Sequence, residues 1–473
     1  MNSFPQFSGR TVPSVAIPLA LLADKLVFPG DPGWDEARLA WNLAVDQQPA
    51  AVALPESVED VMAVVELASR EGLRVAAQGT GHNAGPLGSL EDTILVKTSR
   101  MRGVSIDPVA RTARAEAGVL WGEVSEAAGE HGLAALAGSS PDVGVVGYTL
   151  GGGVSWLARK YGLAANSLLA VELVTADGRF VRADRENEPE LFWALRGGGG
   201  SFGVVTAVEF TLYPVAELYA GVLFFPIERA AEILGAWREW VDTVPDEVMS
   251  VGRLLQLPPI PEVPEFLRGR SFVVVEAAIL ADEAAGAELV RPLRELGPEI
   301  DTLAMIPATA LKTLHMDPEQ PVPGAGDGGM LSDFTPEAID ALVETVPGSP
   351  LLSVEVRHLR GALAKPSPEH GALASLEGGF LYFSVGIAPT PELKEAVERH
   401  AELVKAVLEP WSAGRTYLNF VETPTDSRRF FGEVSHRRLR AIKARVDPVD
   451  LIRSNHPVWA ARVEREGTNL TLT

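Results

Sequence analysis

Three glycine-rich segments between residues 78 and 205 constrain the fold of this chain more than any other feature. They read QGTGHNAG over 78–85, GSSPDVGVVGYTLGGG over 138–153 and LRGGGGSFGVV over 195–205. Glycine lets the backbone pass close to a ligand, and successive main-chain amides can surround an anion. One such segment is typical of a turn, whereas three in one region favour a large phosphate-bearing ligand held by main-chain groups. The spacing Gly79-x-Gly81 only superficially imitates a dinucleotide fingerprint, because Pro86 interrupts any following helix.

From about Pro49 to Pro214, short apolar strands alternate with amphipathic helices around these segments. Ser57 begins the clearest helix, because it is a capping residue followed by acidic residues and then by apolar residues at helical spacing. Strands are predicted over 50–54, 73–77, 93–97, 114–117, 170–176, 178–182 and 204–212, and helices over 57–70 and 120–131. This pattern predicts an α+β fold.

Beyond about Val215 the predicted strands become longer and lie between helices. Helices are predicted over 227–243, 281–296 and 433–446, and strands over 271–280, 351–359 and 380–387. The pattern fits a large antiparallel sheet with helices on one face. Two stretches rich in proline or glycine, Leu257–Pro264 and Pro318–Gly329, are predicted as a surface loop and as a mobile loop or lid.

The composition limits the classes of function. Lys and Arg number 41 and Asp and Glu 63, and the resulting charge of −22 disfavours nucleic acid and anionic membrane as partners. The chain has no cysteine, which excludes disulfides and thiol nucleophiles, and the scattered histidines predict no metal site. No run approaches the length of a membrane span, which is about 18 apolar residues. Val15–Ala23 has only a weak likeness to a signal peptide, so we expect a cytoplasmic protein, whose oligomeric state the sequence does not indicate.

Several motifs resemble one family of flavoproteins. The segment ARLAWN at 37–42 and Gly79-x-Gly-His82 are similar to the PCMH-type FAD-binding domain of the vanillyl-alcohol-oxidase superfamily. Four further motifs resemble the berberine-bridge-enzyme-like branch of this superfamily. They are PELFWALRG at 189–197, SFGVVT at 201–206, YLNF at 417–420 and IRSN at 452–455. The matches lie near both ends of the chain, and the middle carries little family signal.

The resemblance implies an FAD-binding domain in two parts with an inserted substrate domain. Residues 1–215 would form the first part, with the PCMH-type core at about 45–215, and residues 416–473 would return to complete the domain and the flavin site. Residues 216–415 would form the substrate domain, an antiparallel sheet plus helices over the flavin.

The resemblance also implies that FAD is bonded covalently to His82. Many relatives add a second bond from a cysteine in a G-x-C-P-x-V-G pattern, but here Ser140 occupies that position, so a single bond is expected. The segment Ala165-Asn166-Ser167 departs from the family pattern x-Asp-Asn, which makes the contacts there less certain. The cofactor-binding residues so implied are Gln78, Gly79, Thr80, Gly81, His82, Asn83, Ser140, Asp142, Val143, Gly144, Gly147, Tyr148, Gly151, Gly152, Gly153, Gly162, Asn166, Gly203, Val205, Tyr417 and Asn455.

The implied activity is an FAD-dependent oxidase that takes a hydride from a small organic CH–OH or CH–NH substrate, with oxygen as acceptor. Val143 favours an oxidase, because the family position that it occupies influences oxygen access. A dehydrogenase with poor oxygen reactivity and a flavin-binding protein without turnover remain alternatives. Tyr417 and Asn419 are the catalytic candidates, since they would share a face if 416–420 were a strand. Glu355 and Arg357, and Tyr382 and Ser384, form further same-face pairs on their predicted strands.

Overall fold

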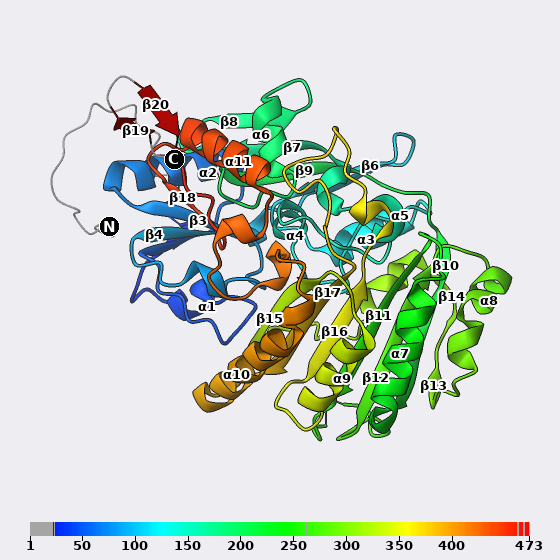
Figure 1. Cartoon of the computed structure of the whole chain (residues 1–473). Helices are drawn as coiled ribbons and strands as arrows, with labels where there is room; N and C mark the ends of the chain where they lie inside the picture. The colour runs from blue at the N-terminus through cyan, green and yellow to red at the C-terminus, as the bar shows by residue number, and fades with distance from the viewer. Residues whose placement is uncertain (1–21, 23, 262, 461–462, 467–468, 473) are drawn as a thin grey trace.

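The N-terminal part of the chain builds two five-stranded sheets, one of which takes its last strand from the C-terminal return, and the residues between build a larger third sheet (Figure 1). The computed structural model describes residues 22, 24–261, 263–460, 463–466 and 469–472. Of the segment Val15–Ala23, all but the buried Leu22 lies outside the described residues. The α+β class predicted from the sequence is confirmed.

The first sheet joins strands from both ends of the chain, in the order β1-β2-β4-β3-β18. β18 lies parallel to β3, which brings the C-terminal return beside the first glycine-rich segment. Helix α2 begins as predicted, because Ser57 accepts a hydrogen bond from the Asp60 N–H and Asp60 reciprocates. The elements are β1 Leu26–Val27, α1 Trp34–Arg38, β2 Ala51–Ala53, α2 Val58–Glu71, β3 Arg74–Gln78, β4 Thr93–Lys97 and β18 Ile452–Arg453.

The second sheet is antiparallel, in the order β5-β6-β9-β7-β8. Its core holds Trp121, Phe192 and Phe210, and Leu439 from the C-terminal helix α11 packs into the same core. The elements are β5 Val104–Asp107, β6 Thr112–Glu116, α3 Trp121–Gly129, α4 Val145–Leu150, α5 Ala158–Tyr161, β7 Leu168–Val174, β8 Phe180–Asp184, α6 Pro189–Leu195, β9 Val204–Thr211 and α11 Glu433–Val446.

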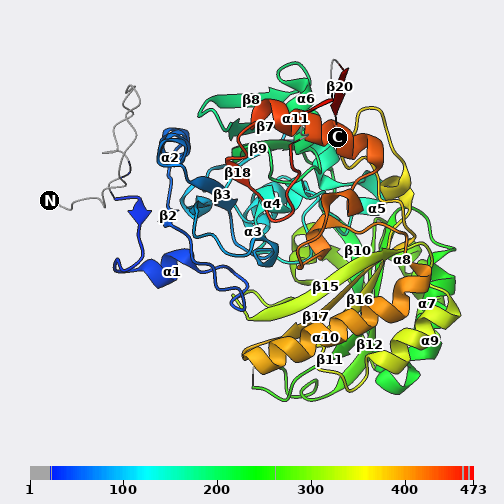
Figure 2. The ribbon, with the colours of Figure 1, turned by 60° about the vertical axis from the view of Figure 1, so that its left-hand side comes forward.

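The third sheet is antiparallel and carries helices on one face, as predicted (Figures 1 and 2). Trp237, Phe334 and Phe380 pack between these helices and the sheet. The other face of the sheet turns toward the glycine-rich region, where Phe224 and Val251 share a core with Trp156. The elements are β10 Glu217–Pro226, α7 Ala230–Val241, β11 Val248–Gln256, β12 Ser271–Ile279, α8 Glu283–Arg294, β13 Ile300–Asp301, β14 Ala304–Pro307, β15 Gly324–Leu331, α9 Pro336–Thr345, β16 Ser353–His358, β17 Phe380–Ile387 and α10 Pro391–Leu408; a separate hairpin pairs β19 Val463–Glu466 with β20 Asn469–Leu472.

Two local predictions are wrong. Much of the expected lid at Pro318–Gly329 is strand β15, which pairs with β17 along its whole length. Its glycines suit a close approach, since a Cβ on Gly328 would lie 2.5 Å from the Tyr382 carbonyl oxygen. Residues 416–420 are not a strand either, because Leu418–Phe420 is a 3₁₀ turn.

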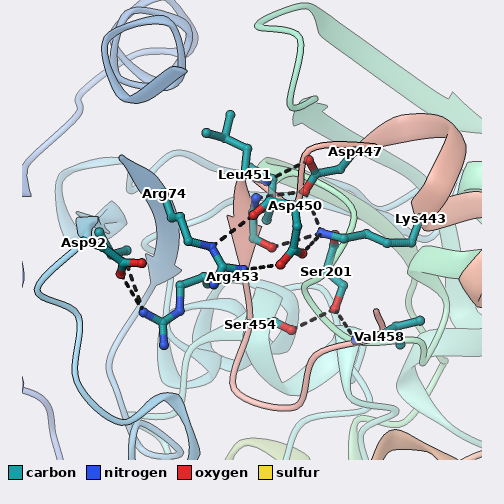
Figure 3. Close-up of polar contacts among 12 residues, drawn as sticks. Arg74, Asp92, Ser201, Lys443, Asp447, Asp450, Leu451, Arg453, Ser454 and Val458 are labelled. Atoms are coloured by element: carbon teal, nitrogen blue, oxygen red, sulfur yellow. Dashed lines mark hydrogen bonds and ion pairs between the residues drawn. The ribbon is translucent and has the colours of Figure 1, made fainter. Parts of the chain in front are cut away.

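A buried ion pair attaches the C-terminal return to the third glycine-rich segment (Figure 3). Lys443 Nζ lies 2.6 Å from Asp447 Oδ2 and donates to the carbonyl oxygens of Ser201 and Ile452, each at 3.0 Å. Asp447 in turn accepts the N–H groups of Leu451 and Ile452, both at 2.8 Å. The return and the glycine segment therefore form one hydrogen-bonded unit.

Candidate functional site

A cavity of about 1000 Å³ lies between the glycine-rich region and the third sheet. One wall is made by main chain from all three glycine-rich segments and by residues 453–455 of the C-terminal return. The opposite wall is made by side chains of β11, β16 and β17 and by the loop after β11. The cavity thus has a backbone-lined half and a side-chain-lined half.

The first glycine-rich segment follows directly from strand β3. Gly81 has φ +92°, and a Cβ there would lie 2.9 Å from the Ala40 Cβ, so a side chain would meet both strain and a clash. The Trp41 N–H donates to the Thr80 carbonyl oxygen at 2.9 Å, which ties the segment to the chain before β2. The segment therefore packs closely against the chain before β2, and only glycine fits at position 81.

His82 lies in this cavity against an aromatic ring and a carboxylate. Its ring stacks on Trp41 with centroids 3.9 Å apart and an interplanar angle of 20°. Its Nε2 is buried without a hydrogen-bond partner among the described residues and lies 3.5 Å from Asp142 Oδ1. Asp142 accepts from the Ser140 hydroxyl at 2.8 Å and from the indole N–H of Trp41. Burial opposes ionisation of Asp142, but His82, Ser140 and Trp41 outweigh it and lower its pKa.

The second and third glycine-rich segments both line the cavity, and the second leaves open space there. Nothing lies within 4 Å of a Cβ built on Gly147, and the nearest atom to one on Gly144 is Thr80 Cγ2 at 3.7 Å. Gly199, Gly200 and Gly203 line the cavity from a separate segment. An FAD would fit this set of residues, since glycine walls admit a large ligand against the main chain and the unpartnered His82 lies among them.

The two catalytic candidates from the sequence lie together although they are not on a strand. The Tyr417 hydroxyl accepts hydrogen bonds from the Gly153 N–H at 2.8 Å and from Asn419 Nδ2 at 3.0 Å. Asn419 Nδ2 also donates to the Tyr148 carbonyl oxygen at 2.9 Å. Burial raises the pKa of Tyr417 well above its ordinary value, so the hydroxyl keeps its proton at neutral pH.

A buried network of charges forms the floor of the side-chain-lined half. His315 lies between two carboxylates, with Nδ1 2.5 Å from Glu276 Oε2 and Nε2 2.7 Å from Glu355 Oε2. Arg253 lies 3.1 Å from Glu276 Oε1, and Arg357 donates to both oxygens of Glu355, at 2.8 and 3.1 Å. Burial lowers the pKa of His315, but the neighbouring carboxylates raise it overall to about 9, so this imidazole is protonated at neutral pH.

The same network keeps its carboxylates ionised. Burial disfavours the charge on Glu355, but Arg357 and His315 outweigh burial and lower its pKa far below the ordinary value. The pKa of Glu276 is lowered in the same way by Arg253 and His315. Among the described residues, no group of three or more histidine and carboxylate side chains is arranged to hold a metal ion. No helix of the described part of the chain is long and apolar enough to cross a membrane.

Most residues predicted for the site do line the cavity. They are Gln78, Gly79, Thr80, Gly81, His82, Asn83, Ser140, Val143, Gly144, Gly147, Tyr148, Gly151, Gly203, Val205, Tyr417, Asn419 and Asn455. Asp142, Gly152 and Gly153 lie behind the lining, against His82 or Tyr417. Gly162 and Asn166 are not part of the cavity wall, and the Asn166 side chain instead bonds Gly371 and Leu373.

Of the further same-face pairs, Glu355 and Arg357 line the cavity, whereas Tyr382 and Ser384 face away from it. Sequence reasoning did not select Trp41, Arg253, Glu276 or His315. A signal for two of them was present, since Arg253 and Glu276 are single charges within otherwise apolar strands, and such a buried charge needs a partner.

Comparison with known proteins identifies the ligand class. Residues 49–184 match the family described as FAD binding domain. The chain is 37% identical over 210 residues to (R)-6-hydroxynicotine oxidase of Paenarthrobacter nicotinovorans, which covers 44% of this chain and 46% of that protein. It is 34% identical over 223 residues to glucooligosaccharide oxidase of Sarocladium strictum, covering 46% and 44%. An FAD-linked oxidoreductase of Dictyostelium discoideum is 24% identical over 88% of this chain and 90% of its own length.

Two solved structures share the whole fold. The 6-hydroxy-D-nicotine oxidase from Arthrobacter nicotinovorans superposes with a TM-score of 0.81 at 26% identity, covering 94% of this chain and 99% of that one. BBE-like 1 of Physcomitrella patens gives 0.81 at 22% identity, covering 93% and 98%. The alignments to the two named oxidases span less than half of those proteins, so their substrates do not transfer with the match.

The glycine-walled cavity, the matching domain and the relatives together define an FAD-dependent oxidoreductase. The chain carries an FAD binding domain at residues 49–184, is similar to (R)-6-hydroxynicotine oxidase over part of its length, and has BBE-like proteins among its structural neighbours.

Proposed function

We propose that this chain is an oxidase that takes a hydride from a CH–OH or CH–NH carbon of a small organic substrate, with FAD bonded to His82 and oxygen as acceptor. The observation that carries this proposal is the cavity itself, which joins a glycine-lined wall containing His82 to a side-chain-lined wall within one space of about 1000 Å³. The oxidase relatives support it.

The cofactor would be held mainly by main chain. The segment 78–83 and glycines of the other two segments would offer backbone amides, with open space at Gly147, and the side chain of His82 would form the single covalent bond. Asp142 Oδ1 lies 3.5 Å from Nε2 and would stay beside the bonded imidazole. Bound FAD supplies the acceptor for the hydride and returns the electrons to oxygen.

The residues of the chain orient the substrate. The Tyr417 hydroxyl accepts two hydrogen bonds and keeps its own proton, so it can donate a third bond to a substrate oxygen or nitrogen. Asn419 fixes the position of that hydroxyl from the side. Glu355 is ionised and directs the Arg357 guanidinium along the cavity wall, where Arg357 also lies 5.1 Å from the ring centroid of Phe420.

Oxygen as acceptor is supported by Val143, a small side chain on the cavity wall beside Gly144. A dehydrogenase would have the same fold and the same reduction step, so reoxidation separates the two. We also propose that the protein is located in the cytoplasm, as expected from its sequence.

The test is a two-step mixing experiment on the purified protein. Candidate alcohols and amines are added without oxygen and bleaching of the visible flavin band is followed; air is then admitted and hydrogen peroxide is measured. An oxidase bleaches, recovers its colour rapidly and forms one peroxide per turnover. Slow recovery would assign a dehydrogenase, and a protein that no alcohol or amine can bleach would contradict the proposal. Tyr417→Phe should slow the bleaching step, whereas Val109→Ser, at a 94% exposed position outside the cavity, should leave it unchanged.

A further inference from the structure

The sheet wall of the cavity is largely apolar beyond the charged network. The antiparallel register places Leu255, Ser353 and Val385 in one row across β11, β16 and β17, and all three line the cavity. Phe224 and Ile387 line it from β10 and β17. A substrate that lies against this wall meets carbon on most of its surface.

The side chains around the mouth of the cavity are also mostly apolar. The loop after β11 and the turn after Ala308–Thr313 contribute Leu257, Pro258, Ile260, Val263, Leu267 and Met316 to the lining. Ile260 is 43% exposed and Met316 is 47% exposed, so two large apolar side chains stand at the entrance in contact with water. Exposed apolar side chains gathered at one entrance mark a binding surface for apolar groups.

The charged network in the floor has no surplus of either sign. Arg253, His315 and Arg357 face Glu276, Glu355 and Asp317, which is three positive groups against three negative ones when His315 is protonated. The carboxylates of Glu276 and Glu355 are already committed to these partners. They leave few acceptors for the many hydroxyl groups of a sugar, and no net charge to hold an ion.

A small number of polar atoms remains free for the substrate. The hydroxyls of Tyr148 and Ser353 are buried on the cavity wall without a hydrogen-bond partner among the described residues. Within the same part of the chain, Arg357 Nη1 has no hydrogen-bond partner, while Nε and Nη2 are held by Glu355. Together with the Tyr417 hydroxyl, these atoms can satisfy one compact polar group, while the sheet wall around Leu255, Val385 and Ile387 offers carbon.

We infer that the substrate is an uncharged alcohol or amine with a predominantly apolar body, and that it is not a saccharide. This rests on the proposed function. The polar end lies against Arg357, Tyr148 and Ser353, and the apolar body lies along the sheet wall with its far end beneath Ile260 and Met316.

The test measures occupancy of the cavity, which does not require that the probe be the natural substrate. The oxygen-free holoenzyme is titrated with benzyl alcohol, 4-ethylbenzyl alcohol and 4-butylbenzyl alcohol, and with cellobiose, and any shift or bleaching of the flavin band reports binding. Burial of one methylene tightens binding about fourfold. We therefore expect the dissociation constant to fall at least tenfold along the alcohol series, with no spectral change from cellobiose at concentrations that saturate the alcohols.

Two variants test whether the apolar side chains at the entrance cause the tighter binding of the longer alcohols. Ile260→Ser and Met316→Ser alter exposed side chains. Each should reduce the gain in affinity of 4-butylbenzyl alcohol over benzyl alcohol at least threefold, and should leave the dissociation constant of benzyl alcohol unchanged. Val109→Ser should behave as wild type throughout. A dissociation constant that does not change along the series, or cellobiose binding as tightly as benzyl alcohol, would overturn the inference while leaving the oxidase proposal intact. A protein without flavin colour overturns both, and this is seen before any probe is added.

Discussion

Replacing Lys443 with methionine removes the cation that ties helix α11 to strand β18 and to the third glycine-rich segment (Figure 3). The side chains of Lys443 and Asp447 are 1% and 0% exposed, so the aspartate would be left as a buried charge. Methionine fills a similar volume, and the two backbone N–H groups at Asp447 remain, but the charge loses its counter-ion. Removal of one partner of a buried ion pair costs about 3–5 kcal/mol.

The cost can be measured by thermal unfolding. For a chain of this length, unfolding entropy near the midpoint converts a loss of about 3–5 kcal/mol into a fall in Tm of about 3–5 °C. Circular dichroism and the rise in flavin fluorescence on unfolding should report the fall together, because Ser201 and Ser454 hold the glycine segment and the return to each other at 2.8 Å.

The matched control lies on the same helix. Arg437 is 67% exposed and pairs with Glu433 at 3.2 Å, so Arg437→Met should change the free energy of unfolding by less than about 0.5 kcal/mol. A Lys443→Met variant that unfolds at the same temperature as this control would refute the reasoning, because the buried pair would then contribute no more than an exposed one.

Three further outcomes follow from ionisable groups at the site. The pKa of His315 is raised from 6.5 to about 9, so its protonation stabilises the fold fully below pH 6.5, and this stability is lost as pH rises through 9; urea unfolding of wild type and His315→Gln should converge across that window. Burial and the Asp327 carboxylate raise the pKa of Glu422 from 4.5 to about 8, so wild-type stability should fall between those pH values relative to Glu422→Gln. Asp142→Asn should lower the fraction of protein with covalent FAD several-fold, as read by intact mass, because His82 loses its neighbouring carboxylate.

Much of the fold could be predicted because its signals are local. The periodicity over residues 57–70 and the capping residue Ser57 identify helix α2, and the apolar runs at 93–97 and 380–387 coincide with strands β4 and β17. Strand β15 was missed because its glycines are typical of a loop. Only the pairing with β17, and the Phe383 ring lying 3.2 Å from a Cβ built on Gly328, explain a glycine-rich strand.

The site was predicted less evenly. Each glycine-rich segment is continuous in sequence, and His82 lies within the first of them, so these patterns can be read directly. The charge network is assembled from β11, β12, β16 and the turn at His315, and its members meet only through the register of the sheet. The spacing of these residues along the chain therefore does not indicate that they are in contact. Tyr417 and Asn419 lie together for a reason different from the predicted strand. They stand at a 3₁₀ turn, where Asn419 Nδ2 donates to the Tyr417 hydroxyl, which also accepts from the Gly153 N–H.

Denaturing intact-protein mass spectrometry, with a visible spectrum of the same sample, tests most directly whether FAD is bonded to His82. Wild type should be yellow and heavier than the bare chain by the mass of one FAD, and His82→Ala should lose that added mass. A yellow wild-type protein whose denatured mass equals that of the bare chain would contradict the covalent bond.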